Sequence, residues 1–557
     1  QARHHNSDES LFKKLEHRVD GMIVDAHSIK YLLDLHDEDS HCGELCLAYI
    51  TEKFFEGKSF MNWKKFEEMI TKIYGDKISD DPYQPQEIHL ALTNSTDSMN
   101  VMYVTMEQLN DPFVEVALVN DNDNDQDENE NNWVRYSAMN STYRVPQKWW
   151  PIFTGTIYSA NMESLIEGGK QYKYKVGGTS PDGKLKVSNI FQFKTPPIAS
   201  PNRETIVATL ADHGTFELLG WKTIDVLVKK KDELNIDFVH VAGDLSYAGL
   251  STDMKLLHVD KEDEFEHIWD LLFIQNQPIA SVMPWMVSNG NHERFYNWAS
   301  YKARFTMPIN NDDHNQLLSN GSFWYTYEYG NTRWISLSSE SDLSDGSIQK
   351  TFLINTLEYA INKRNIVPWI IISIHKPMHC SAGGDNGYDN GFAQLLEDTL
   401  LKYDVDLVIQ GHLHAYERIH PTIKNQVTVW PDKVDNVDIY HTQGKGPVQI
   451  VQGNSGGMQA EKWMNPAPEW SAVRMSNGYI PKNTTSSENS DNKKSGHLSI
   501  HGIIDDIKKI KNYHYVDTYG FGVAKFINAT HMFYQSIPVE HEVGYDSFWI
   551  VKREEDS

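Results

Sequence analysis

Two patterns of hydrophobic and polar positions divide most of the chain. Between residues 85 and 195, short segments such as 88–92 and 172–176 alternate apolar and polar side chains, and turn-forming clusters separate them. Strands that bury one face show this period of two, and several in succession predict a β-sandwich. Beyond a cluster of prolines, continuous apolar runs alternate with helical stretches such as 216–234 and 265–275. This rhythm predicts an α/β domain with buried parallel strands.

The chain is 557 residues long, too long for one ordinary core, so about two or three domains are expected. Its beginning is rich in charge and helix formers, with apolar side chains at helical spacing. We predict a helical extension over 1–84, the sandwich over 85–198 and the α/β domain over 199–557. Two polar stretches, 120–132 and 477–496, predict surface loops.

Five apolar runs in the α/β domain each end in polar side chains that can bind metal ions. The five motifs are Asp212-His213-Gly214, Gly243-Asp244-Leu245-Ser246-Tyr247, Gly290-Asn291-His292-Glu293, His375-Lys376-Pro377 and Gly411-His412-Leu413-His414. Because α/β sheets gather their chemistry beyond the carboxyl ends of the strands, we expect these side chains to meet in one crevice. Oxygen and nitrogen donors in that number suit a pair of metal ions. The sequence therefore predicts a dinuclear metal hydrolase.

In their order along the chain and in their local sequence, the five motifs resemble those of the calcineurin-like metallophosphoesterases. Tyr247, three residues after Asp244, narrows the resemblance to the purple acid phosphatases. Further matching segments extend it over residues 85–551. The resemblance implies a fibronectin III-like domain, as in the large plant-type enzymes, before the α/β catalytic domain. That catalytic domain is implied to have an α+β core built as a four-layer β-sandwich.

The resemblance also implies a ligand set for two ions. Seven side chains are the implied ligands: Asp212, Asp244, Tyr247, Asn291, His375, His412 and His414. Asp244 would bridge the ions, and the other two anionic donors with His414 would complete one site. Carboxylates and a phenolate are hard donors that favour Fe³⁺. The neutral amide and imidazole donors of the other site suit a divalent ion, Zn²⁺, Fe²⁺ or Mn²⁺.

The predicted reaction is hydrolysis of phosphate monoesters by attack of a metal-bound hydroxide. His292, beside the ligand Asn291, is the predicted general acid that protonates the leaving group. Its alternative role is that of a structural histidine that hydrogen-bonds to the ligands. The plant-type enzymes often carry a further histidine within the segment that corresponds to 381–390, and this segment has none. His379, which stands where a tyrosine is frequent, is the second catalytic candidate.

Charge and composition narrow the possible partners and the compartment. A formal net charge of −26 argues against nucleic acid or an anionic membrane as the main partner. Phosphorylated substrates, small molecules or phosphoproteins, remain compatible, because bound cations dominate the field of a metal site. The apolar runs are strand-sized, so we expect no transmembrane helix. Three cysteines make no disulfide framework.

Five N-x-S/T sequons suit a glycoprotein of the secretory pathway, secreted or held in an acidic, vacuole-like compartment. They lie at Asn94, Asn140, Asn320, Asn483 and Asn528. We expect a signal peptide that has been removed or that precedes this sequence.

Two alternatives stay open at this point. One is a phosphoprotein phosphatase or a nucleotide phosphodiesterase on the same metal core. The other is a binding protein that kept the phosphoesterase fold without activity. Retention of all seven ligands and His292 argues against the second alternative.

Overall fold

The protein is described here from a computed structural model. The described ranges are 79–119, 132–145, 155–215, 220–248, 267–309, 318–383, 387–457, 462–475, 518–539 and 546–552, together with the backbone of four short strands. These strands form two antiparallel pairs, β1 (Val24–Asp25) with β2 (Phe60–Met61) and β26 (Gly478–Pro481) with β27 (Tyr513–Val516). The predicted helical extension over 1–84 and the predicted loops over 120–132 and 477–496 lie almost wholly outside these ranges.

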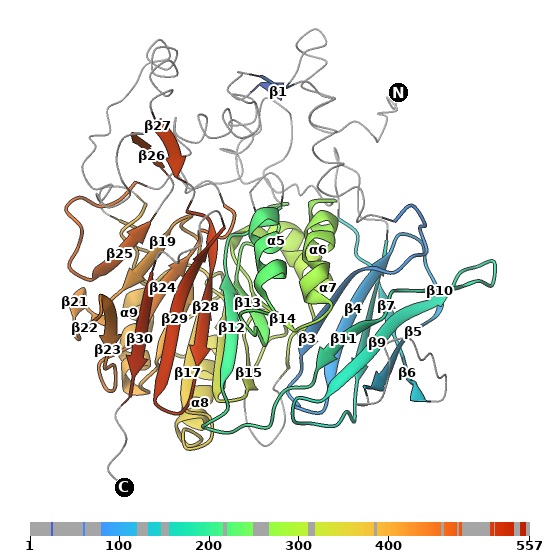
Figure 1. The fold of residues 1–557 in the computed structure, drawn as a ribbon, viewed down its shortest axis with the longest axis horizontal. Helices are drawn as coiled ribbons and strands as arrows, with labels where there is room; N and C mark the ends of the chain where they lie inside the picture. The colour runs from blue at the N-terminus through green and yellow to red at the C-terminus, as the bar shows by residue number, and fades with distance from the viewer. Residues whose placement is uncertain are drawn as a thin grey trace.

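The first domain is a β-sandwich (Figure 1). One sheet has the order β3 (Gln86–Leu92), β4 (Met99–Thr105), β8 (Thr156–Met162), β7 (Met139–Ser141). The other has the order β10 (Leu185–Val187), β9 (Gln171–Thr179), β5 (Asn110–Leu118), β6 (Val134–Ser137), with β11 (Phe191–Lys194) also paired to β9. Every second residue along β9 is buried from Tyr172 to Val176. The alternating pattern of the sequence is thus confirmed as an all-β domain.

The second domain contains two mixed sheets. The eight-stranded sheet has the order β14 (Trp285–Ser288), β13 (Phe238–Ala242), β12 (Thr205–Leu210), β28 (Gly520–Phe526), β29 (His531–Pro538), β30 (Ser547–Val551), β23 (Val437–Tyr440), β22 (Asp432–Val434). The seven-stranded sheet has the order β15 (Tyr325–Tyr329), β16 (Thr332–Leu337), β17 (Trp369–Ile374), β18 (Leu407–Gln410), β24 (Val448–Gln452), β19 (Tyr416–Ile419), β25 (Ser471–Met475). A short hairpin joins β20 (Thr422–Ile423) to β21 (Gln426–Val427).

Parallel strands stand at one end of the eight-stranded sheet and in the middle of the seven-stranded sheet. Strands β12, β13 and β14 are parallel, as are β16, β17, β18 and β24. In the eight-stranded sheet, the C-terminal strands β28, β29 and β30 are antiparallel to one another and β28 is antiparallel to β12, whereas β30 is parallel to β23. The α/β prediction is therefore confirmed as a mixed rather than an all-parallel fold.

Helices cover the outer faces of the two sheets. Helices α8 (Ile348–Ile361) and α9 (Phe392–Lys402) pack on one face of the seven-stranded sheet, whose Ile370 and Ile372 face them. The intervening Ile371 lies in the core shared with the eight-stranded sheet. Helices α5 (Gly220–Lys230) and α6 (His267–Ala280) contribute to that same core. None of the helices in the described ranges is long and apolar enough to span a membrane.

The sandwich packs against the second domain through α6 and through α7 (Phe295–Arg304). Strand β3 contacts α6, and the Tyr174 hydroxyl donates a hydrogen bond to the Ser281 carbonyl at 2.7 Å. Arg304 forms ion pairs with Glu87 at 2.8 Å and with Asp270 at 2.6 Å. The Arg304 and Glu87 side chains are each 1% exposed. These contacts join the two domains through buried charge as well as apolar surface.

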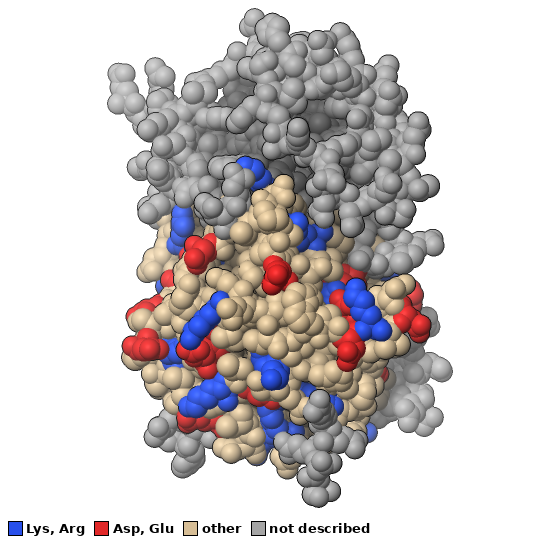
Figure 2. All heavy atoms as spheres, turned by 90° about the vertical axis from the view of Figure 1, so that its left-hand side faces the viewer, with Lys and Arg blue, Asp and Glu red and all other residues tan. Residues whose placement is uncertain are grey.

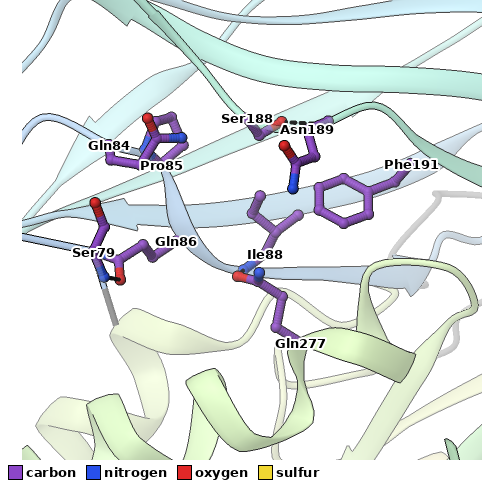
Figure 3. A pocket seen from close by; sticks show the side chains of 9 residues that line it. All are labelled: Ser79, Gln84, Pro85, Gln86, Ile88, Ser188, Asn189, Phe191 and Gln277. Carbon is purple, nitrogen blue, oxygen red and sulfur yellow. Dashed lines mark hydrogen bonds between the residues drawn. The ribbon is translucent and has the colours of Figure 1, made fainter. Parts of the chain in front are cut away.

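A cavity of about 140 Å³ lies at this junction, between β3, β11 and α6 (Figure 3). Its walls are mostly amide and hydroxyl side chains, including Gln86, Ser188 and Gln277, with Phe191 on one side. Gln277 accepts a hydrogen bond from the backbone N–H of Ile88, which fixes this wall to the sandwich. The cavity contains none of the predicted metal ligands.

On the face shown in Figure 2, acidic and basic side chains are interspersed over the described residues. This mixture differs from the continuous basic surface by which proteins hold nucleic acid.

Candidate metal centre

Each of the five motifs follows the carboxyl end of a parallel strand. Asp212 follows β12, Asp244 and Tyr247 follow β13, and Asn291 begins η3 (Asn291–Glu293) directly after β14. From the other sheet, His375 follows β17, and His412 and His414 follow β18. The predicted convergence of these loops is what the structure shows, since contacts within hydrogen-bonding distance join them.

One group of contacts joins Asp212, Tyr247 and His414. The Tyr247 hydroxyl donates to Oδ1 of Asp212 at 3.0 Å and lies 2.8 Å from Nε2 of His414. Nε2 of His414 is 3.6 Å from the same Asp212 oxygen. All three side chains are buried. A carboxylate, a phenol and an imidazole thus present their donor atoms to one another, as one predicted ion site requires.

A second group joins Asp244, Asn291, His375 and His412. Nε2 of His375 lies 3.0 Å from Oδ2 of Asp244 and 3.2 Å from Oδ1 of Asn291. One donor atom each from Asp244, His375 and His412 lies within 4.8 Å of the other two, a spacing that could hold a metal ion. These four side chains are the ones that the sequence assigned to the second ion.

Backbone groups orient these ligands. Nδ1 of His375 lies 2.9 Å from the carbonyl oxygen of Ala242, so the Nδ1–H tautomer leaves Nε2 available as a donor to a cation. The backbone N–H of His412 donates to Oδ2 of Asp212 at 2.8 Å. The N–H of His292 donates to Oδ1 of Asp244 at 2.9 Å.

The glycines beside the ligands let the backbone lie directly against them. A Cβ atom on Gly243, whose φ is +89°, would lie 2.6 Å from Nδ1 of His375. A Cβ atom on Gly457 would lie 2.7 Å from the ring of His414. Asp244 itself has a φ of 51°, in the left-handed region that non-glycine residues adopt only where the surroundings hold them. Such strain is typical of functional sites.

The electrostatics of the centre suit a cation. Burial raises the pKa of Asp244 to about 7, although the neighbouring histidines oppose the shift. Burial also lowers the pKa of His375 to about 4, so its imidazole is neutral and keeps a lone pair. A buried carboxylate needs positive charge to stay ionised, and a neutral imidazole binds metals but not protons here. The residues present therefore fit a metal ion.

The two predicted catalytic histidines lie in different surroundings. The ring of His292 lies 4.5 Å from that of Tyr247, so this residue is at the centre. His379 is also buried, but its Nε2 lies 3.2 Å from Oε1 of Glu397 in α9, and its ring packs against Trp470. Its other contact is with Gln449 of β24. The described contacts of His379 are thus with the seven-stranded sheet and α9, and its catalytic role stays a prediction.

Two further residues at the centre were not predicted. Glu293 is fully buried and accepts hydrogen bonds from the loops that carry Asp244 and Asn291. Burial and the Asp244 carboxylate raise the pKa of Glu293 to about 8. Tyr388 packs its ring 4.9 Å from that of His412. Glu293 stands in the predicted motif and could have been found there, whereas nothing in the segment around Tyr388 marks it.

The chain matches two known protein families. Residues 85–195 match the N-terminal domain of purple acid phosphatases, and residues 207–416 match the calcineurin-like phosphoesterases. Acid phosphatase type 7 of Mus musculus is 31% identical over 330 residues, which cover 56% of this chain and 67% of that protein. This chain belongs to the purple acid phosphatase family.

The relatives of this chain differ in the activity that their names describe. Probable inactive purple acid phosphatase 27 of Arabidopsis thaliana is 27% identical over 419 residues, covering 71% of this chain and 64% of that protein. The structure of purple acid phosphatase PPD1 from yellow lupin seeds superposes with a TM-score of 0.63 at 21% identity. That match covers 85% of this chain and 75% of the lupin chain. It establishes the shared fold, a sandwich followed by mixed α/β sheets.

Proposed function

We propose that this purple acid phosphatase hydrolyses phosphate monoesters with two metal ions, Fe³⁺ and a divalent ion. The observation that carries the proposal is the placement of the Tyr247 hydroxyl between Asp212 and His414. A phenol, a carboxylate and an imidazole whose donor atoms face one another suit a trivalent cation, which favours hard anionic donors. The neutral donors around His375 suit Zn²⁺, Fe²⁺ or Mn²⁺.

The residues of the centre have different roles in the proposed reaction. Asp212, Tyr247 and His414 would hold one ion, and Asn291, His375 and His412 the other, with Asp244 between them. When bound, two such cations supply charge that offsets the phosphoryl oxygens and acidifies water. His292, whose backbone is held by Asp244, is placed to give a proton to the leaving group. The buried loops around these ligands keep bulk water from competing for them.

A specific observation favours the inactive alternative. At least one relative of comparable similarity is described as probably inactive, so family membership does not guarantee turnover. We nevertheless favour an active enzyme, because contacts within hydrogen-bonding distance join six of the seven predicted ligands and the seventh, His412, lies against His375.

The experiment that tests the proposal measures turnover and metal content on one purified sample. An aryl phosphate monoester, the matching diester and a phosphopeptide would be assayed from about pH 4 to about pH 9. We expect monoester turnover with a maximum below neutrality and two metal ions per chain. The Asp244→Asn variant supplies the background. Preference for the diester or the phosphopeptide would support the alternative substrates, and turnover equal to that background would support the inactive alternative.

We also propose that the protein matures in the secretory pathway. Four sequon asparagines lie in the described ranges: Asn94, Asn140 and Asn320 are exposed, as a glycan requires, and Asn528 is half-buried. Expression in a eukaryotic secretory host, followed by glycosidase treatment, should lower the apparent mass. An unchanged mass would count against this proposal.

A further inference from the structure

The Glu293 side chain accepts hydrogen bonds from three backbone N–H groups. Oε2 accepts from Gly290 at 2.7 Å and from Asp244 at 3.0 Å, and Oε1 accepts from Leu245 at 2.8 Å. Gly290 precedes η3, whereas Asp244 and Leu245 belong to the loop after β13. One fully buried side chain therefore connects two loops that are distant in the sequence: Asp244 lies 49 residues and Leu245 48 residues before Glu293.

The Asp244 side chain also connects the two loops. Its Oδ1 accepts a hydrogen bond from the backbone N–H of His292 at 2.9 Å, so each loop donates to a carboxylate of the other. Gly290 lies so close to the Asp244 carboxylate that no Cβ atom would fit. Asp244 also keeps a φ of 51°, a left-handed conformation that a non-glycine residue keeps only where its neighbours hold it. Glu293 provides the largest number of those holding contacts.

We propose that Glu293 is a positioning residue that sets the metal affinity of the centre. By fixing the backbone on both sides, it makes the Asp244 and Asn291 side chains face the same ion. Neither shortening nor amidation preserves this role. Aspartate is one methylene too short to reach both loops, and glutamine turns an NH₂ group towards an N–H donor. This role of Glu293 rests on one part of the proposed function, namely that the centre binds a metal ion. It does not require that the protein hydrolyses a substrate.

The test is a titration of metal-free protein with Mn²⁺ by calorimetry. Partners that orient metal ligands are worth roughly 10–100-fold in affinity, so we expect Glu293→Gln to weaken Mn²⁺ binding by about that factor. Glu293→Asp, which keeps the carboxyl group but is one methylene shorter, should also weaken Mn²⁺ binding. The shorter variant also keeps the test decisive if Glu293→Gln does not fold. Wild-type affinity in a folded Glu293 variant would overturn the proposal.

The matched control is Asp237→Asn. Asp237 accepts a backbone hydrogen bond from Ile206 at 2.8 Å, at the opposite end of β13 from Asp244. The Asp237→Asn variant should have a lower melting temperature than the wild type in the metal-free state and an unchanged Mn²⁺ affinity. Equal affinity losses in both variants would show that Glu293 acts through general stability and would overturn the proposal. Wild-type protein that binds Mn²⁺ but shows no turnover after loading with Fe³⁺ and a divalent ion would refute the proposed function and leave the role of Glu293 intact.

Discussion

The Tyr247 hydroxyl lies 3.0 Å from Oδ1 of Asp212, although the two residues belong to different loops and are 35 positions apart. If Tyr247 binds Fe³⁺ as a phenolate, charge transfer from the ring should give the purified protein a visible absorption band. Tyr247→Phe should abolish that band and keep the fold, because phenylalanine fills nearly the same volume. Absorption spectroscopy of iron-loaded protein measures this.

Tyr388→Phe is the matched control for the colour. Tyr388 also packs beside a predicted ligand, with its ring 4.9 Å from that of His412, but it is not a predicted donor. The control should keep the band at its wild-type intensity. Colourless wild-type protein that contains iron would contradict the assignment of Tyr247 as a ligand.

Removing the metal ions should destabilise the folded protein. Without a cation, the Asp212 and Asp244 carboxylates stay buried without the charge that offsets them. A ligand that binds only the folded state stabilises it by about 2.7 kcal/mol at a hundred times its Kd. Differential scanning calorimetry should therefore show a melting temperature that falls on chelation and recovers with added metal. Asp244→Asn should remove most of the recovery, and a wild-type melting temperature that ignores metal would exclude this centre as a binding site.

His292→Ala should lower kcat by roughly 10²–10⁴-fold while both metal ions stay bound. The buried ring lies 4.5 Å from the ring of Tyr247, which places it at the centre without making it a predicted ligand. The loss should be smaller for substrates with acidic leaving groups, since these need less protonation. Steady-state kinetics on an alkyl and an activated aryl phosphate measure the difference. Equal losses on both would exclude His292 as the general acid.

The ligand loops could be predicted from the sequence because parallel strands end at one edge of a sheet. Asp212, Asp244 and His375 each follow a continuous apolar run, and the resemblance of the motifs to a known family indicated that these side chains are ligands. The contacts of Glu293 could not be predicted in the same way. Its partners Asp244 and Leu245 are brought to it by the packing of β13 beside β14, which no local pattern reveals.

Helix boundaries show the same limit. The sequence predicted a helix over 265–275, but α6 continues through Pro278 to Ala280. A proline removes only one hydrogen bond so near the end of a helix, and the Ser281 hydroxyl donates to the Gln277 carbonyl beside it at 2.6 Å. Packing of α6 against β3 outweighs that loss.

Acid should destabilise the protein partly through His240, a core residue away from the ligands. Burial lowers the pKa of His240 to about 3, whereas the ordinary histidine value is 6.5. Between these values the unfolded chain binds a proton that the folded chain does not, so stability falls as the pH falls through this window. The slope is at most about 1.4 kcal/mol per pH unit for one such group.

Replacing His240 by glutamine should reduce this slope, which urea unfolding at a series of pH values measures. Glutamine can still hydrogen-bond to the Tyr327 hydroxyl, which lies 2.8 Å from Nδ1 of His240. His441→Gln is the control, because the His441 side chain is 43% exposed whereas that of His240 is fully buried. If the two variants have the same pH dependence, buried His240 does not cause the acid sensitivity.

Arg304 should be the residue on which the junction of the two domains depends most. Its guanidinium contacts Glu87 at 2.8 Å and Asp270 at 2.6 Å, and the Glu87 side chain is 1% exposed. Arg304→Met leaves Glu87 buried without its partner, a change that typically costs about 3–5 kcal/mol. Thermal unfolding should show a lower midpoint, and limited proteolysis should separate the sandwich more readily.

Arg135→Gln, at an ion pair whose arginine is 53% exposed, should change stability by less than about 1 kcal/mol. The double variant Arg304→Met with Glu87→Met should recover much of the loss, because it removes the unpaired charge. A single Arg304→Met variant as stable as Arg135→Gln would show that the buried pair does not hold the domains together.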